Sequence, residues 1–177
     1  MLGNLHEARM VLPDKLKNTS PLGNVEIRCA GEADVDAIVA LINDAFRVER
    51  FFLDRDRVNR ESVSRCMSQG KFLLAVRDDE ILGCVHVELN GDRGYFGLLA
   101  VDPSRQGMGL GRHLVEAVEA YFRAAGCRFS DMQIVNVRAE LPEFYRRLGY
   151  VECGTEPFTE GVSAIPCHFV NYSKLLL

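Results

Sequence analysis

The run over residues 98–114 constrains this chain more than any other, because it passes from strand to glycine loop to helix without a break. Residues 96–101 are almost continuously apolar, which predicts a buried strand. Gly107, Gly109 and Gly111 then alternate with larger residues, so the backbone can turn tightly and approach a ligand without Cβ atoms in the way. Each glycine weakens a helix interior by roughly 0.5–1 kcal/mol relative to alanine. The loop is therefore predicted to serve a ligand rather than merely to open a helix.

The ligand expected at this loop is a diphosphate. The helix that follows presents free N–H groups and the positive end of its dipole to the loop, which favours anions. Arg105 and Arg112 flank the loop and add positive charge. The run lacks the Lys-Ser/Thr end of a P-loop, and its glycines do not fit the G-x-G-x-x-G spacing of dinucleotide-binding folds. The sequence therefore predicts a pyrophosphate cradle of another kind.

The spacing of apolar residues predicts a single domain over residues 25–177, preceded by an arm over residues 1–24 that has little periodicity and is expected to be poorly ordered. Predicted helices cover 31–46, 56–69, 110–125 and 140–148, the third with Glu119 on its exposed side. A helix between two strands implies a crossover and local parallel pairing. The predicted strands cover 25–29, 71–77, 81–89, 94–101, 132–137, 150–153 and 167–175.

The glycine loop also resembles a known family. Residues 106–111, Gln-Gly-Met-Gly-Leu-Gly, match the Q/R-x-x-G-x-G/A signature of the GNAT superfamily of N-acetyltransferases, and the preceding residues 99–103, Leu-Ala-Val-Asp-Pro, are similar to that family's strand before the loop. The order of predicted elements matches the GNAT fold over about residues 25 to 175. The resemblance implies an α/β (α+β) fold. Its mixed, mostly antiparallel sheet would have about seven strands and about four helices, and would splay open at the cofactor site.

The resemblance implies that acetyl-CoA is the co-substrate and that it binds along this strand and loop. The strand end would bond the pantetheine amides as an added strand does, and a backbone N–H near Leu99 would polarise the thioester carbonyl. Asn136 resembles the family's cofactor-contacting asparagine, although a plain strand cap explains it equally well. The residues implied to bind cofactor are Leu99, Ala100, Val101, Gln106, Gly107, Met108, Gly109, Leu110, Gly111, Arg112 and Asn136.

Residues 144–150, Phe-Tyr-Arg-Arg-Leu-Gly-Tyr, resemble the F-Y-x-x-L-G-F/Y pattern of the family's late helix. Its tyrosine, here Tyr145, commonly protonates the sulfur of coenzyme A. Tyr145 lies at the edge of the apolar stripe of its predicted helix, where its hydroxyl could reach a cleft. The alternative is a tyrosine that only packs at the boundary of the core.

A base must remove the proton of the attacking amine, because an alkyl amine with a pKa near ~10.4 is almost wholly protonated at pH 7. In many family members this base is a carboxylate on a central strand, but the strand at 95–101 carries none. Glu88 and His86 share one face of the preceding strand, two residues apart. Glu88 is the first choice and His86 the second, with His168 as a third candidate. Solvent-facing strand residues without a catalytic role are the alternative.

Composition narrows the function further. A net charge of −4 argues against general nucleic-acid binding, and no apolar run approaches the ~20 residues of a membrane span. The six cysteines form no C-x-x-C pair and mostly lie in apolar runs, so we expect reduced core thiols in a cytoplasmic protein, with Cys84 a weak candidate nucleophile and no metal site.

The sequence predicts acetyl transfer to a small-molecule or peptide amine by direct attack in a ternary complex. A non-catalytic coenzyme A-binding sensor and a transferase for another acyl-CoA are the alternatives. The acceptor is expected to be selected by the loops at 46–56 and 158–166, because such loops vary freely on one scaffold. A homodimer through the C-terminal strands is compatible with the apolar run at 170–177.

Overall fold

The computed structural model describes residues 22–177. Most of the arm expected over residues 1–24 therefore lies outside the described residues, and the domain boundary at residue 25 stays a prediction. Of the arm's last residues, Leu22 is buried and packs in the core. None of the helices within residues 22–177 is both long and apolar enough to cross a membrane.

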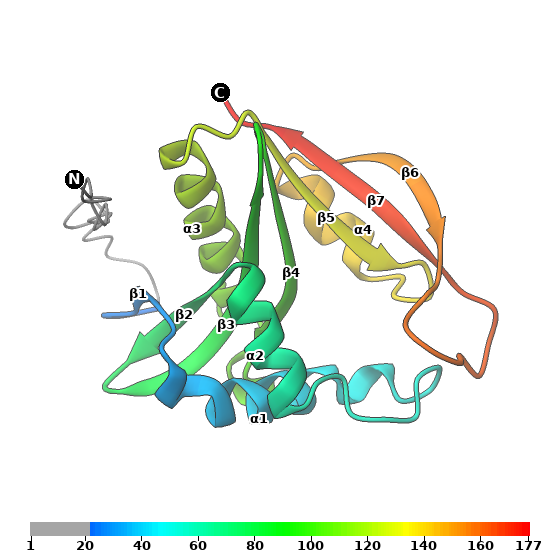
Figure 1. Cartoon of the computed structure of the whole chain (residues 1–177), viewed down its shortest axis with the longest axis horizontal. Coiled ribbons are helices and arrows are strands. Elements are labelled where there is room, and N and C mark those ends of the chain that lie inside the picture. The colour runs from blue at the N-terminus through cyan, green and yellow to red at the C-terminus, as the bar shows by residue number, and fades with distance from the viewer. Residues whose placement is uncertain (1–21) are drawn as a thin grey trace, which may run out of the picture.

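The domain is built on a seven-stranded sheet of order β1-β2-β3-β4-β5-β7-β6 (Figure 1). All neighbouring strands are antiparallel except β4 and β5, which are parallel as the crossover predicted. The fold prediction is confirmed in strand number and pairing. The strands are β1 Glu26–Cys29, β2 Lys71–Arg77, β3 Glu80–Asn90, β4 Arg93–Val101, β5 Phe129–Val135, β6 Val151–Pro157 and β7 His168–Leu175.

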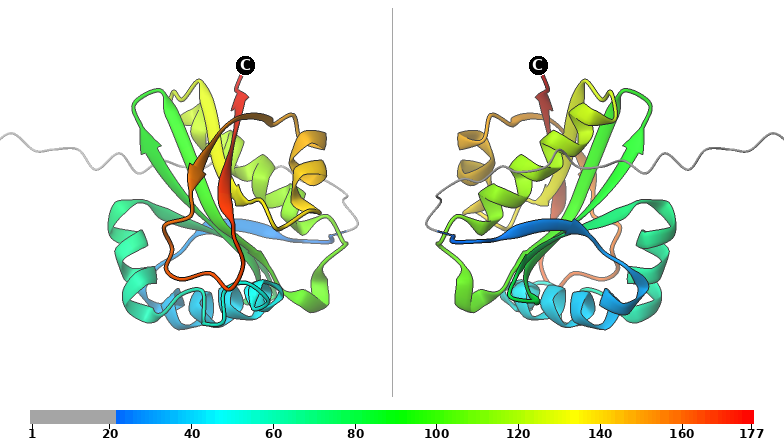
Figure 2. Two further views of the ribbon diagram at one scale, coloured as in Figure 1. Left: turned by 90° about the vertical axis from the view of Figure 1, so that its right-hand side faces the viewer. Right: turned by 90° about the vertical axis from the view of Figure 1, so that its left-hand side faces the viewer.

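Four α-helices cover the two faces of this sheet: α1 Val35–Ala45, α2 Arg60–Gln69, α3 Leu110–Ala124 and α4 Leu141–Arg147. Figure 2 shows α1 and α2 on one side of the sheet and α3 and α4 on the other. A hydrophobic core lies on each face of the sheet. Successive residues of one strand point to opposite faces, so Leu73 of β2 packs with α3 and Leu74 packs with α1. Three short 3-10 helices complete the domain: η1 Glu32–Asp34, η2 Phe46–Glu49 and η3 Pro103–Arg105.

Several sequence predictions need correction. Strand β6 runs to Pro157 rather than 153, because Gly154–Pro157 continue its pairing with β7, and β5 ends at Val135 rather than 137. Helix α2 begins at Arg60 rather than 56, because the side chain of Asn59 accepts from the Ser62 N–H and caps the helix there. Strand β5 begins at Phe129, three residues before the predicted start at 132, because Phe129–Asp131 pair with β4. Glu119 is buried instead of exposed: its carboxylate accepts from Lys174 at 2.7 Å and from Arg123 at 3.3 Å.

The pairing of β4 with β5 stops soon after it starts. Only Arg93–Tyr95 pair with Phe129–Asp131, and beyond that point no ladder joins the two strands. The closed end is held by Arg93, which donates to both carboxylate oxygens of Asp131 at 2.6 and 2.7 Å. The strands therefore diverge from a fixed point, which is the splay that the resemblance implied.

Strand β4 is also bulged at the open end. Cys84 pairs with Ala100 and His86 with Gly97, so one residue of β3 faces both Leu98 and Leu99. Leu98 has a φ of 49°, which is rare for a non-glycine residue. The bulge shifts the register between β4 and β3 at the place where β4 separates from β5.

Gly94 allows α3 to pack closely on β4. A Cβ atom at Gly94 would lie 2.4 Å from the ring of Phe122, which is fully buried. We expect Gly94→Ala to lower the free energy of unfolding by about 1–3 kcal/mol, as overpacking does. Gly154→Ala on β6 is the matched control, because its Cβ would meet only the Asn171 amide at 3.9 Å. Equal losses of stability in urea denaturation of the two variants would contradict this packing argument.

Candidate active site

The glycine loop ends in a helix start whose N–H groups have no intrahelical acceptor. Gly107 and Gly109 have φ values of 77° and 90°, in the left-handed region that favours glycine. Gly109 is the N-cap of α3 and contributes no side-chain cap, and the first helical bond shown for this turn runs from the His113 N–H to the Gly109 carbonyl. The N–H groups of the preceding turn are therefore available to an anion.

The two arginines beside the loop are already in surface ion pairs. Arg112 donates to Glu116 at 2.8 Å, and Arg105 lies 3.6 Å from Glu80. Both pairs are largely exposed, and exposed ion pairs contribute little free energy, so either guanidinium can turn to a phosphate at small cost. The backbone amides are the fixed part of this anion site.

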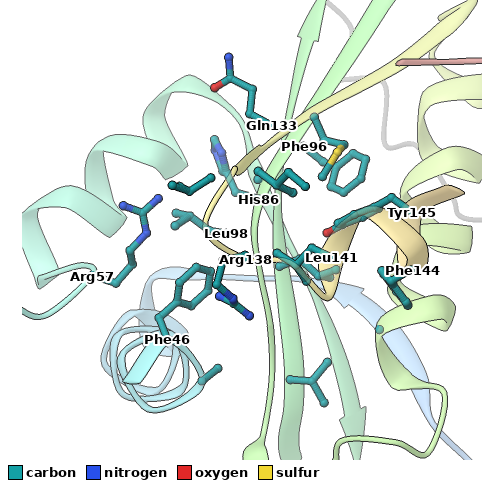
Figure 3. A pocket seen from close by; sticks show the side chains of 18 of the residues that line it. Phe46, Arg57, His86, Phe96, Leu98, Gln133, Arg138, Leu141, Phe144 and Tyr145 are labelled. Carbon is teal, nitrogen blue, oxygen red and sulfur yellow. The ribbon is translucent and has the colours of Figure 1, made fainter. Parts of the chain in front are cut away.

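A single cleft of about 800 Å³ runs from the glycine loop through the gap between β4 and β5 (Figure 3). Its walls along the gap are Leu98, Leu99 and Val101 of β4 and residues 132–135 of β5. At the far end it is lined by residues of η2, β3 and the loop at 158–167. The divergence of two strands thus makes a channel joining an anion site to a second chamber, which we call the acceptor chamber.

Most of the residues predicted to bind cofactor line this cleft, namely Leu99, Val101, Gln106, Gly107, Gly109, Leu110, Gly111 and Arg112. Three others do not. Ala100 is buried among residues of α1, and Met108 is largely exposed outside the cleft. The side-chain oxygen of Asn136 accepts from the His168 N–H at 2.9 Å, which supports the strand-cap alternative.

Tyr145 lies on α4 with its hydroxyl turned toward the cleft (Figure 3). The residue is 5% exposed, and no hydrogen-bond partner for its hydroxyl occurs within residues 22–177. Burial raises the pKa of Tyr145 well above its usual value, although the charge of Arg138 opposes this shift. The phenol is therefore a protonated donor at neutral pH. Leu141 and Phe144 of the same helix are half-buried and line the cleft beside it.

His86 and Glu88 lie together on β3, as the spacing predicted, and both line the acceptor chamber. His86 is buried, and its Nε2–H donates to the Cys66 carbonyl at 2.9 Å. Its Nδ1 lies 3.5 Å from Oε1 of Glu88, whose side chain is about one-third exposed. The structure therefore places a solvent-accessible carboxylate beside a fixed imidazole. His168, the third candidate, is exposed at the start of β7 and lies outside the cleft.

Sequence reasoning missed four charged residues that wall the acceptor chamber. Glu49 accepts from Arg138 at 2.7 Å, and Arg57 forms a short ion pair with Glu160. Burial raises the pKa of Glu49 despite the opposing charges of Arg57 and Arg138. Burial disfavours the charged form of Arg57, but the hydrogen bond and charge of Glu160 outweigh it and raise its pKa. In the sequence these residues look like ordinary loop charges, and no local pattern marks them.

The same ion pairs join the two loops expected to select the acceptor. Arg55 and Arg57, from the segment after η2, bond to the carbonyl and the carboxylate of Glu160 respectively. The Ala164 N–H donates to the Phe52 carbonyl at 2.8 Å, and Phe52 and Phe158 make an edge-to-face contact. The two loops therefore form one continuous wall.

The cysteines are free thiols, but only Cys84 and Cys127 are buried, so the expectation of core thiols holds for a minority. Cys84 does not line the cleft, and burial raises its pKa to about 12. Since the thiolate is the nucleophile, Cys84 has neither the access nor the ionisation that a covalent route would need.

Comparison with known proteins places this cleft in context. The sequence model of the acetyltransferase (GNAT) domain matches residues 36–170. An aminoglycoside N(6')-acetyltransferase type 1 from Stenotrophomonas maltophilia is 35% identical over 92 residues, which cover 46% of this chain and 59% of that protein. The chain thus spans less than two-thirds of the length of this curated relative.

Solved structures share the fold. The ribosomal-protein-S18-alanine N-acetyltransferase from Escherichia coli superposes with a TM-score of 0.68 at 16% identity, covering 86% of this chain and 94% of that chain. The protein yncA from Salmonella typhimurium, solved with its cofactor acetyl-CoA, gives 0.67 at 21% identity, covering 87% of this chain and 95% of that chain. At these identities the likeness shows the arrangement of the elements only.

The state of Cys84 can be tested by alkylation. At pH 8 a thiol with a pKa of about 12 is thiolate about 10³-fold less often than one with the ordinary value of 9.0, and the Cys84 side chain is also inaccessible. We expect iodoacetamide to label the exposed Cys153 in the native protein and to leave Cys84 unlabelled, as read by peptide mass mapping. All six should react in guanidinium chloride. Labelling of native Cys84 as fast as Cys153 would show that this reading of the thiol is wrong.

Proposed function

The chain belongs to the GNAT family of acetyl-CoA-dependent N-acetyltransferases, and we propose that it acetylates an amine by direct attack, with both substrates held in the cleft described above. The observation that supports this most strongly is the continuity of the cleft. It joins the free amides at the start of α3, the gap between β4 and β5, Tyr145 and Glu88 in one cavity. A protein that only bound coenzyme A would need the free amides and the gap between the strands, but neither Tyr145 nor Glu88.

The residues present fit acetyl-CoA. Free N–H groups at residues 107–112 would hold its diphosphate, because the left-handed Gly107 and Gly109 keep Cβ atoms out of the loop. The edge of β4 that faces β5 is unpaired at 98–101 and would bond the pantetheine arm as an added strand does. When bound, the co-substrate supplies the acyl thioester, and the bulge at Leu98 turns backbone groups toward the gap where a carbonyl oxygen could be stabilised.

Two side chains would move protons in this proposal. Glu88 accepts the proton of the incoming ammonium group, directly or through water, which leaves a neutral amine able to attack. Tyr145 donates its phenolic proton to the departing sulfur, which its raised pKa keeps available at neutral pH. His86, whose Nδ1 lies 3.5 Å from the Glu88 carboxylate, is the alternative base.

The acceptor is an amine that the comparisons do not identify. The names of the similar proteins offer an aminoglycoside amine and the N-terminal alanine of a ribosomal protein as two classes to test. A reducing, cytoplasmic location is also part of this proposal, supported by the six unpaired cysteines. So is a homodimer, supported by the exposed edge strand β6, in which Val151 is 68% exposed.

Tyr145→Phe tests catalysis against simple binding. We expect kcat for release of coenzyme A thiol to fall about 10²-fold or more, because a general acid typically contributes that much. Stabilisation of the variant by acetyl-CoA in thermal unfolding should match the wild type, at about 2.7 kcal/mol when the ligand is at 100 times its Kd. Full turnover by the variant at every pH would remove Tyr145 from the mechanism and favour another proton donor.

Glu88→Gln and His86→Gln identify the base. We expect kcat/KM of Glu88→Gln to fall about 10²-fold and to lose its dependence on pH on the acidic side, since an amide cannot take up a proton. His86→Gln should lower the rate less and keep that dependence, because Glu88 is still present. The reverse pattern, with pH dependence lost only in His86→Gln, would assign the base to His86.

A further inference from the structure

The acceptor chamber carries an excess of negative charge. Three carboxylates line this end of the cleft, from Glu49, Glu88 and Glu160, against two guanidinium groups, from Arg57 and Arg138. Glu140 also lines the cleft, but it shares a neighbouring hollow with Arg112 of the glycine loop. Both guanidinium groups are already paired with these acids, Arg138 with Glu49 and Glu140 and Arg57 with Glu160. The positive charge of each arginine is therefore offset by a carboxylate, although Arg57 Nε is buried without a hydrogen-bond partner.

Glu88 is the chamber carboxylate without a guanidinium or ammonium partner. Within residues 22–177 the one basic side chain within ion-pair distance of its carboxylate is His86, at 3.5 Å. In the proposed reaction this carboxylate faces the amine that is acetylated. It cannot at the same time neutralise a second charge on the acceptor.

A second unpaired carboxylate lies beside the chamber, on β6. Glu156 accepts from Gln133 Nε2 at 3.2 Å and from Asn171 Nδ2 at 3.0 Å, and no lysine or arginine of the described chain pairs with it. Gln133 itself lines the cleft (Figure 3), so it connects Glu156 to the chamber wall. Two neutral amides hold this carboxylate in place without cancelling its charge.

Tyr95 lies opposite Glu88, because the two residues pair across β4 and β3. It comes from β4, lines the chamber and is mostly buried. Burial, and then the charges of Glu160 and Glu88, raise its pKa to about 12, with Glu156 adding to the shift and Arg57 opposing it. The phenol of Tyr95 therefore stays neutral and offers a hydroxyl to the chamber.

This inference rests on the proposed acetyl transfer. We infer that the acceptor carries a second cationic group besides the amine that reacts, and that this distal cation is held near Tyr95 by Glu156. The shared chemistry is that of a dication, either a linear diamine or a diamino sugar. An acceptor with a distal carboxylate would meet the uncompensated negative charges of Glu88 and Glu156, so amino acids should be poor acceptors.

The first test compares acceptors that differ only at the distal group. A five-carbon α,ω-diamine is assayed against the amino alcohol and the amino acid of the same chain length, and a diamino sugar against glucosamine. We expect kcat/KM for a dication to exceed that of its neutral partner about 10-fold, with the amino acid lowest. The series with the larger preference distinguishes the linear from the sugar source. Comparable rates within both series would overturn the inference and leave the acetyl transfer intact.

The second test locates the distal cation. Glu156→Gln should raise KM for the better dication about 5-fold or more. It should leave kcat and the KM of the neutral acceptor within about 2-fold, which a general structural defect would not do. Glu152→Gln is the matched control, because it removes the same charge from the same exposed strand, while Glu156 alone of the two bonds to the cleft residue Gln133. An unchanged KM for the dication in Glu156→Gln would overturn the placement.

Calorimetry with coenzyme A bound separates failure of this inference from failure of the proposed function, because it detects acceptor binding without turnover. Selective binding of a dication that is lost in Glu156→Gln supports the cation site, whether or not an amine is acetylated. If such binding occurs but no amine is acetylated, the proposed acetyl transfer is overturned and the cation site stands. Binding of neither dication, or equal binding of dication and neutral partner, overturns the inference.

Discussion

The site depends on the early end of the β4–β5 ladder. These are the only parallel neighbours in the sheet, and they pair over just three residues before they diverge. The bidentate contact of Arg93 with Asp131, supported by Ser173, fixes the point of divergence. Since the backbone groups that face the gap beyond that point have no partner strand, they are satisfied by solvent or by a ligand. The cleft is a consequence of pairing that is left incomplete.

Buried charges organise the other end of the cleft. Glu49 is about nine-tenths buried, and its ion pair with Arg138 connects η2 to the turn before α4, the helix that carries Tyr145. Arg57 and Glu160 connect the two long loops in the same way. Burying a charge is unfavourable unless it is paired, so removing one partner leaves the other unsatisfied. The network therefore holds segments distant in sequence in one arrangement around the acceptor chamber.

Local patterns predicted the parts of the site that are themselves local. The glycine loop, the helix start and the pair His86 and Glu88 are set by neighbours within a few residues, where backbone geometry and strand periodicity apply. Prediction failed where a distant partner decides the outcome. Glu119 falls on the polar side of its helix by periodicity, yet Lys174 from the last strand provides the partner that allows it to be buried. Arg57 and Glu160, more than a hundred residues apart, carry no signal in either segment alone.

The sequence by itself determined the order of elements, the family resemblance and the positions of the glycine loop and of Tyr145, because each is encoded in a contiguous run. The tertiary structure decided how far β4 and β5 separate, which carboxylates line the cleft and which of them lack a positive partner. Those properties depend on interactions between residues far apart in the sequence, and a single ion pair or hydrogen bond can decide whether a charge is compensated. A chain read residue by residue contains the charges but not their pairing, and the pairing is what gives the acceptor chamber its net sign.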